Sequence, residues 1–442
     1  MKIFKFTPHI ISISSFFLII YVAYKFFIFH EGQYFYYYKK YFIITSILFL
    51  ISLLLFFTSE ILRKIIFLSL VSCIVAIYLV ETVLVIQLKN SLSKKLGNLA
   101  DKRSKIEVIL NLRKNGIEAN PSMYANYSSK ENIYSFGGIS KILTILCNEN
   151  GYWASYLSDR YGFRNQDIFW DSKDIALMMG DSTGQGSCVN NENYFSKNFS
   201  HSLKENKNFQ KTNILNLSIG ARGPLTTYAN LREYIDIIKP KKIIWLYHES
   251  NDLYDLESEM TNGFLKQYLD DENFSQKLYL QQSKIDRILL ENSKNDLSNK
   301  IKNPSKKLNG WYDYTNFIRL SLLRLTTLHP DQINYSDTTL KNFSIVMNKV
   351  KTLSKKYNSD LYFVYIPDYA RFINNNNNSY YKDYNKILDI IQNLKIQTID
   401  INKELFQDEV DPLKYFPFRK RGHYNEAGYN ELAKHIYKNI KW

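Results

Sequence analysis

Four short stretches of the chain end in residue types that acyl-transfer chemistry uses. Each of the first three follows an apolar run typical of a buried strand, and the fourth comes after the last such run. The stretches are Gly180-Asp181-Ser182, Ser218-Ile219-Gly220, Ser250-Asn251-Asp252 and Gly422-His423. Sites in open parallel sheets form at the carboxyl ends of the strands, so we expect the Ser, Gly, Asn and His of these stretches to lie close together.

These residue types match the parts of a serine acyl-transfer site. A serine that attacks an acyl carbon must lose its hydroxyl proton, and a neutral imidazole can accept it near pH 7. Negative charge then develops on the carbonyl oxygen, where each backbone N–H or Asn amide donor contributes about 3–4 kcal/mol. Gly, Asp and Ser are also common in surface turns. Their placement after successive strands favours the site over the turn.

The first 96 residues have the composition of a membrane anchor. Apolar runs at about 10–29, 41–58 and 65–88 approach the length of about 20 residues with which a helix crosses the hydrocarbon core. Lys25 and Glu81 lie near the ends of their runs, where long side chains can reach the interface. A buried helical hairpin is the alternative, and three runs in succession disfavour it. We predict three transmembrane helices in a lipid bilayer, followed by a soluble domain over 97–442.

Strand and helix patterns alternate in that domain. The predicted strands are Ile175–Met179, Ile214–Ile219, Ile243–Tyr247, Leu361–Ile366 and, more weakly, Gln397–Ile401; two predicted helices are Leu225–Ile238 and Leu340–Lys355. This alternation predicts an α/β fold with a parallel sheet covered on both faces. Residues 255–335 read as a helical insertion, and the five Asn at 374–378 as a loop.

Charge and cysteine content exclude some classes of function. The net charge is +15, but the Lys residues are scattered and form neither a basic helix nor a nucleic-acid motif, so we expect no nucleic-acid partner. The cysteines are Cys73, Cys147 and Cys188, and no Cys/His spacing resembles a zinc site, so we expect no metal. Cys73 lies in an apolar run, which leaves at most one pair, and Cys188 is interpreted as a packed thiol.

The chain resembles the SGNH, or GDSL-type, hydrolases in four sequence blocks. The blocks are GDSTGQGSCV, NLSIGARGPL, ESNDL and GHYNEAGY, and the preceding SDRYGFRNQD is similar to a lead-in found in some bacterial members. The resemblance covers residues 150–442 and implies a flavodoxin-like three-layer fold and a cofactor-free esterase or acyltransferase. It implies Ser182 as nucleophile, His423 as general base and an oxyanion hole formed by Ser182, Gly220 and Asn251. Spacing from Asn216 fits Ala221 as well as Gly220.

One departure from the family pattern concerns the acid that orients the histidine. The family usually has Asp three residues before the His, and this chain has Lys420 there. Asp411, in the same predicted loop, is the first candidate for the acid, and Glu249 is the second. The alternative is a Ser-His dyad whose imidazole is oriented by a backbone carbonyl. His248 is interpreted as structural.

Three further alternatives stay open at this stage. Gly180-Asp-Ser-Thr-Gly184 also matches the nucleophile elbow of α/β-hydrolases, although that fold places several strands before the elbow. The missing acid is also compatible with an inactive module that binds glycans or anchors partners. Hydrolase and acyltransferase share every residue named. Membrane-tethered relatives often act on O-acyl groups of cell-envelope polysaccharides, which implies an acyl ester or O-acylated glycan as substrate.

The sequence also predicts membrane orientation. Positive residues flanking the three spans are nearly balanced and slightly favour an external N-terminus. The resemblance to envelope-modifying enzymes implies the opposite, with Met1 inside and the soluble domain in the periplasm of a bacterium. Alkaline phosphatase fused after residue 442 is therefore expected to be active. A well-expressed but inactive fusion, together with an active cytoplasmic reporter at the same point, would reverse the orientation.

Overall fold

The computed structural model describes most of the chain. The described residues are 3–29, 35–96, 101–123, 126–190, 196–200, 212–302, 314–327, 334–373, 381–419 and 422–442. The Asn run at 374–378 and Lys420 lie outside them. The chain divides into two compact units, Met1–Gly97 with Pro304–Asp331, and Asn98–Asn303 with Gln332–Trp442.

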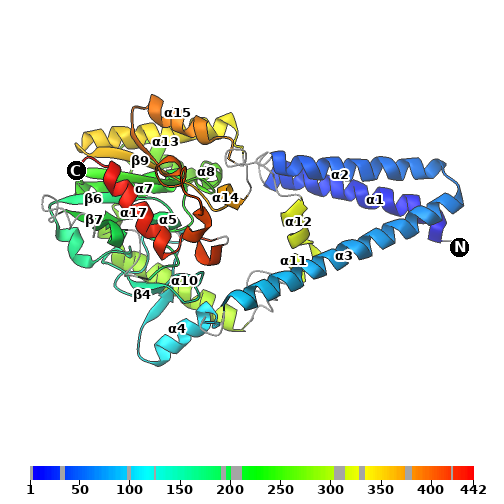
Figure 1. Ribbon diagram of the computed structural model, residues 1–442, viewed down its shortest axis with the longest axis horizontal. Coiled ribbons are helices and arrows are strands. Elements are labelled where there is room, and N and C mark those ends of the chain that lie inside the picture. Colours follow the sequence, from blue (N-terminus) through cyan, green and yellow to red (C-terminus); the bar gives the residue numbers. More distant parts are fainter. Residues whose placement is uncertain are drawn as a thin grey trace. The chain divides into compact units, whose positions relative to one another are not determined.

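The first unit contains the three predicted apolar helices. They are α1 (Ile3–Ala23), which continues as a π-helical turn over Tyr24–Phe29, α2 (Phe35–Leu54) and α3 (Glu60–Leu96) (Figure 1). The segments Pro8–Ile28, Tyr38–Phe57 and Glu60–Gln87 are long and apolar enough to cross a membrane. This agrees with the expected anchor.

Part of the predicted insertion belongs to this first unit. It forms α11 (Tyr314–Ile318) and α12 (Ser321–Thr327). Glu81 of α3 is fully buried and accepts hydrogen bonds from the backbone N–H groups of Leu322 and Leu323 at 3.0 and 2.7 Å. Glu81 thus satisfies the first turn of α12. The expected position of Glu81 at the membrane interface stays a prediction, and the structure adds that its carboxylate is paired with these N–H groups.

The second unit is built on a five-stranded parallel sheet. Its strands are β6 (Ile175–Met179), β7 (Asn213–Asn216), β8 (Lys242–His248), β9 (Asp360–Ile366) and β10 (Gln397–Asp400). Their spatial order is β10-β9-β8-β6-β7, and every pairing is parallel. Counted along the chain this is the order 2-1-3-4-5, which is flavodoxin-like. All five predicted strands are confirmed.

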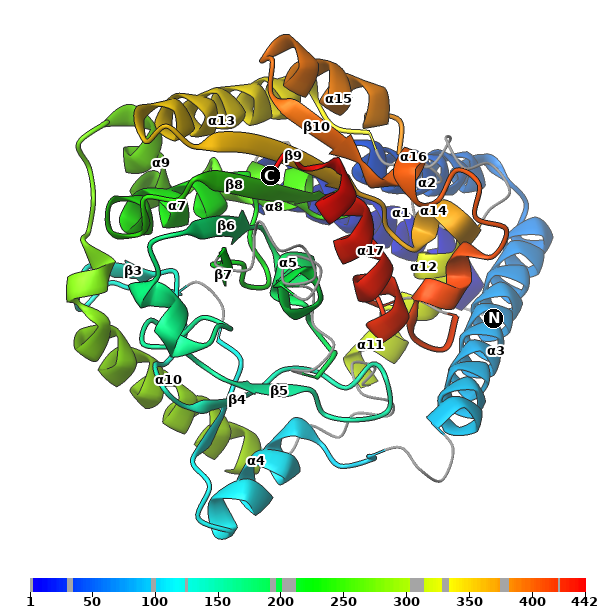
Figure 2. The same ribbon diagram turned by 60° about the vertical axis from the view of Figure 1, so that its left-hand side comes forward.

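Successive side chains of each strand point to opposite faces of the sheet, as the two-residue period of a strand requires, and both faces are buried. Leu177, Trp245 and Phe363 pack in a core with α7 (Pro224–Ile238) and α13 (Asp337–Lys356). Their neighbours Met178, Ile244 and Val364 pack in a second core with α17 (Glu426–Asn439). The result is the expected three-layer arrangement of helix, sheet and helix (Figure 2). The smaller helices of this unit are α14 (Ala370–Ile373), α15 (Tyr384–Asn393) and α16 (Ile401–Glu404).

Short strands precede the main sheet. After α4 (Lys105–Lys114), β1 (Ala119–Pro121), β4 (Leu143–Ile145) and β5 (Ser155–Leu157) form a three-stranded sheet, and β2 (Asn126–Ser128) pairs with β3 (Ile133–Ser135). The rest of the insertion supplies α8 (Asp252–Glu259), α9 (Gly263–Asp270) and α10 (Gln282–Lys302). The loop between antiparallel β4 and β5 is the feature that matters for the site.

Candidate active site

Ser182 lies at the corner where β6 leads into the short helix α5 (Ser182–Gln185). The preceding Asp181 caps this turn by accepting a hydrogen bond from the Thr183 N–H at 2.8 Å. A Cβ on Gly184 would come within 2.4 Å of the Ser218 hydroxyl, so only glycine lets the loops after β6 and β7 approach this closely. Gly186 ends the turn with a φ of 71°. The two glycines therefore permit the tight backbone turn that places Ser182 at the corner.

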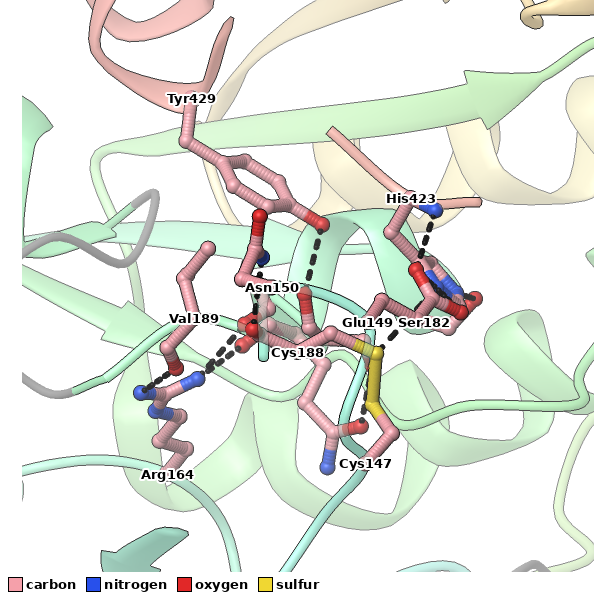
Figure 3. Close-up of a disulfide and its surroundings, with 12 residues drawn as sticks. Cys147, Glu149, Asn150, Arg164, Ser182, Cys188, Val189, His423 and Tyr429 are labelled. Atoms are coloured by element: carbon pink, nitrogen blue, oxygen red, sulfur yellow. Dashed lines mark hydrogen bonds and ion pairs between the residues drawn. A yellow bond between two sulfur atoms is a disulfide. The ribbon is translucent and has the colours of Figure 1, made fainter. Parts of the chain in front are cut away.

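Arg164 of the lead-in holds the same turn from the other side. Its buried guanidinium donates to the carbonyl oxygens of Gly186 and Val189 at 2.7 and 2.9 Å (Figure 3). The next residue, Asn165, bonds the backbone of Asn216 in both directions, at 2.8 and 3.0 Å. The lead-in thus fixes the loops of the first two blocks relative to each other.

Ser182, His423 and Glu149 form a continuous chain of hydrogen bonds. The distance from Ser182 Oγ to His423 Nε2 is 2.9 Å, and from His423 Nδ1 to the two Glu149 carboxylate oxygens 3.1 and 3.2 Å (Figure 3). The His423 N–H also donates to Glu149 at 2.7 Å. The His423 and Glu149 side chains are 27% and 29% exposed, so solvent reaches the site. This is the geometry of a nucleophile, a base and an orienting acid.

Gly422 makes room for the carboxylate. A Cβ at this position would lie 2.7 Å from Glu149 Oε2, and the φ of Gly422 is 151°. Both features favour glycine, because any side chain here would push Glu149 away from the ring.

Glu149 also changes the protonation of His423. Burial opposes the imidazolium, but the hydrogen bond and negative charge of Glu149 outweigh it, and the pKa of His423 lies above 6.5. Asp181 and Asp368 are the other carboxylates that raise this pKa. The ring is therefore stabilised in the charged form that a general base reaches after it takes the serine proton.

Asp411 lies elsewhere. Its carboxylate forms an exposed ion pair with Arg419, with a distance of 2.7 Å between Oδ2 and Nη1. The prediction that Asp411 bonds the His423 ring is therefore wrong, because its carboxylate bonds Arg419 instead. Glu149 bonds His423 Nδ1 in its place. The sequence did carry one signal for Glu149. With Cys73 in an apolar run, Cys147 and Cys188 are the remaining pair, and a bridge between them brings residue 149 toward Ser182.

Glu249, the second candidate acid, bonds buried groups other than His423. It forms an ion pair with Arg371, and both side chains are at most 1% exposed. It also accepts hydrogen bonds from the Tyr365 hydroxyl at 2.6 Å and the Asp368 N–H at 2.7 Å. These partners stabilise the loop after β9 and leave Glu249 turned away from His423.

Asn251, one of the expected oxyanion donors, is connected to Ser182 through Asp181. The Asn251 amide donates to Asp181 Oδ2 at 3.0 Å, and Ser182 Oγ lies 3.3 Å from the same oxygen. His248, interpreted as structural, has Nδ1 at 3.0 Å from Asn251 Oδ1. Within the described residues, the backbone N–H groups of Ser182 and Gly220 donate to no protein group. Preorganised donors of this kind can bind a developing oxyanion. Among the residues that the structure describes, the Ala221 N–H has no acceptor either, so the choice between Gly220 and Ala221 stays open.

Residues of the insertion support these donors. Glu259 accepts from the N–H groups of Gly223 and Leu225 at 2.7 and 2.9 Å, which fixes the loop after Gly220. Asp255 accepts from the Asn251 amide at 3.1 Å. Burial raises the pKa of Asp255 to about 7, against the opposing effect of that hydrogen bond. Asn251 is therefore held between two carboxyl groups.

A disulfide joins Cys147 to Cys188, with their Cα atoms 4.9 Å apart. Our interpretation of Cys188 as a packed thiol is thus wrong. Among the described residues, the one group with metal-binding side chains is Glu149, Cys188 and His423. A disulfide sulfur lacks the thiolate that metals prefer, and the other two side chains bond each other. The donor set fits a hydrogen-bonded triad better than a metal centre.

No profile of a known protein family matches the chain, and no curated protein matches it. Among solved structures, it is similar to the acetyl xylan esterase AlAXEase, with 12% identity over 60% of this chain and 100% of that one, and a TM-score of 0.33. It is also similar to a two-domain esterase (CEX) active on acetylated mannans, with 11% identity, 62% and 50% coverage, and a TM-score of 0.34. A third similar structure is that of a Desulfitobacterium hafniense protein described as a putative lipolytic protein of the G-D-S-L family. It has 10% identity over 61% of this chain and 100% of that one, and a TM-score of 0.33. TM-scores of this size do not establish a shared fold.

The triad predicts a specific pH dependence. In a serine mechanism the neutral imidazole is the active base, so kcat/KM of the native protein on an acetyl ester should rise with pH through an apparent pKa raised above the ordinary value of histidine. Glu149→Gln removes the carboxylate and leaves burial, which shifts this pKa downward. It should also lower kcat by about 10²–10⁴-fold. Asp411→Asn is the matched control and should change neither quantity. Loss of activity in Asp411→Asn with full activity in Glu149→Gln would contradict the assignment.

The buried ion pair predicts a stability effect. Glu249→Ala leaves the Arg371 cation buried without its carboxylate, which should cost about 3–5 kcal/mol in the free energy of unfolding. Asp411→Ala, which breaks an exposed pair, should cost about 0–1 kcal/mol. Denaturant unfolding of the full chain in detergent measures both. An unchanged unfolding midpoint for Glu249→Ala, accompanied by loss of Ser182 reactivity, would make Glu249 part of the chemistry instead.

Proposed function

We propose that the protein is a membrane-anchored serine enzyme that hydrolyses or transfers the acyl group of carbohydrate esters. The observation that carries the proposal is the hydrogen-bonded chain from Ser182 through His423 to Glu149. The backbone N–H groups of Ser182 and Gly220, which bond no other part of the described chain, support it. An inactive binding module would have no need of this geometry. An α/β-hydrolase is disfavoured because β6, which precedes Ser182, is the first strand of the main sheet along the chain.

In the proposed reaction, Ser182 Oγ attacks the acyl carbon while its proton passes to His423 Nε2. Glu149 stabilises the resulting imidazolium through Nδ1. The N–H groups of Ser182 and Gly220 bind the negative carbonyl oxygen. The Asn251 amide joins them by exchanging its hydrogen bond to Asp181 or Asp255 for one to the oxyanion. His423 then gives the proton to the sugar oxygen as its bond to the acyl carbon breaks, which leaves the acyl group on Ser182. An incoming hydroxyl attacks the acyl carbon and gives its proton to His423, which returns that proton to Ser182 Oγ as the bond between Ser182 and the acyl group breaks.

The acceptor decides between hydrolase and acyltransferase. Water gives the free acid, whereas a sugar hydroxyl gives a new ester, and the same residues serve both reactions. The resemblance to membrane-tethered envelope enzymes supports an O-acylated cell-envelope glycan as substrate. The disulfide supports a domain on the oxidising side of the bacterial cytoplasmic membrane, since such bridges persist in the periplasm and are rare in the cytosol.

The decisive test is ester turnover by the full chain in detergent. The native protein should hydrolyse a chromogenic acetyl ester and react with a fluorophosphonate at Ser182. Ser182→Ala and His423→Ala should each abolish turnover, and the double variant should be little worse than either single one. Added sugar acceptors that divert acetyl groups from water would identify a transferase.

Ser354→Ala is the matched control, because the Ser354 hydroxyl donates to the Lys351 carbonyl oxygen within α13 at 2.8 Å and contributes nothing to the site. It should keep turnover and labelling. Substantial turnover by well-folded Ser182→Ala would exclude the serine mechanism.

A further inference from the structure

The acid and the disulfide share one short loop. Cys147 and Glu149 both lie between β4 and β5, whose ends are held by hydrogen bonds between the backbones of Leu146, Cys147 and Ala154 at 2.8 and 3.0 Å. Glu149 is thus two residues from the bridge. In Figure 3 the bridge and the Glu149 carboxylate lie side by side near His423.

Cys188, the other half of the bridge, belongs to the segment that carries the nucleophile. It is fully buried and has a φ of 65°. It lies just after the end of α5, the short helix that begins at Ser182. Arg164 bonds the carbonyl oxygens on both sides of it, and the Tyr429 hydroxyl donates to the Ser187 carbonyl oxygen at 3.4 Å (Figure 3). Cys188 is therefore a fixed anchor point relative to Ser182.

The bridge thus connects a fixed anchor to the loop that carries the acid. A second link beside it is weaker, the hydrogen bond from the Asn150 amide to the Cys188 carbonyl oxygen at 3.0 Å. Cys188 Sγ also lies 3.6 Å from His423 Nδ1, next to the carboxylate that this nitrogen bonds. Glu149 itself is 29% exposed, so water competes with His423 for its carboxylate unless the loop is held.

We propose that the Cys147–Cys188 disulfide is a positioning element that holds Glu149 against His423, so that the acid serves acyl transfer only in the oxidised protein. This inference rests on the proposed function. Reduction by a dithiol transfers two electrons and two protons to the bridge, which gives two cysteine thiols, while the dithiol closes to its own cyclic disulfide. The freed loop then samples positions in which Glu149 faces water.

The experiment compares variants of the full chain in detergent, all carrying Cys73→Ser so that the bridge supplies the only thiols. The variants are Cys147→Ser/Cys188→Ser, Glu149→Gln and the triple combination. EDTA in every buffer prevents trace-metal binding by freed thiols. Each protein is assayed for kcat, KM and pH profile on an acetyl ester, below the unfolding temperature of the least stable variant.

We expect loss of the bridge, by serine substitution or by dithiol, to lower kcat at least tenfold with little change in KM. It should also shift the apparent pKa of kcat/KM downward, as Glu149→Gln does. Because both changes remove the same interaction, the triple variant should stay within about twofold of Glu149→Gln, the non-additivity expected of coupled groups. An unchanged kcat on loss of the bridge, or an equal further loss in the Glu149→Gln background, would overturn the proposal.

A second measurement does not depend on turnover. Selective ¹³C labelling of the seven histidines, with His423 assigned by His423→Gln, reports the pKa of this ring by NMR. The groups that face the ring are Glu149 from the β4–β5 loop, Asp181 after β6 and Asp368 after β9. Reduction should lower the pKa of His423 as far as Glu149→Gln does. An unchanged pKa would refute the positioning role, whereas a lowered pKa in a protein without esterase activity would refute only the proposed function.

Discussion

The imidazole of His423 must bond two partners at once, and much of the structure serves this requirement. Its ring nitrogens reach Ser182 and Glu149, which precede it by 241 and 274 residues. A planar ring cannot adjust to an error on one side without losing the other bond. Three segments therefore have to arrive at one point with little freedom: the end of β6, the turn before α17 and the loop between β4 and β5.

Buried polar side chains, rather than the hydrophobic core alone, supply this accuracy. The two cores set the distance of α7, α13 and α17 from the sheet, but apolar contacts are not directional. Arg164, Asn165 and Glu259 bond backbone groups of the site loops in defined directions. Such side chains cost desolvation that their hydrogen bonds must offset, so they are used where orientation matters.

The sequence predicted the features that follow from local pattern. The strands of the main sheet are apolar runs, and the close approach of Ser182 and His423 agrees with their places after those runs. Glu149 escaped prediction because β4 and β5 have three residues each, too few to show a period, and because the loop meets His423 only through tertiary structure. The prediction of Asp411 as the acid rested on its nearness to His423 in sequence, but its carboxylate forms an ion pair with Arg419. That part of the insertion packs with α3 could not be predicted either, because the backbone groups that bond Glu81 lie 241 and 242 residues further along the chain.

Gly422 and the β4–β5 loop also bear on which part of a chain can supply an orienting carboxylate. The acid of a triad accepts one hydrogen bond and supplies one charge, so any chain segment that passes the ring can provide it. In the proposed reaction the serine and the histidine have no such freedom, because both must face the substrate. A carboxylate on the β4–β5 loop can therefore bond the ring as well as one close to His423 in sequence, and Lys420 at the nearby position is no evidence against a hydrogen-bonded triad.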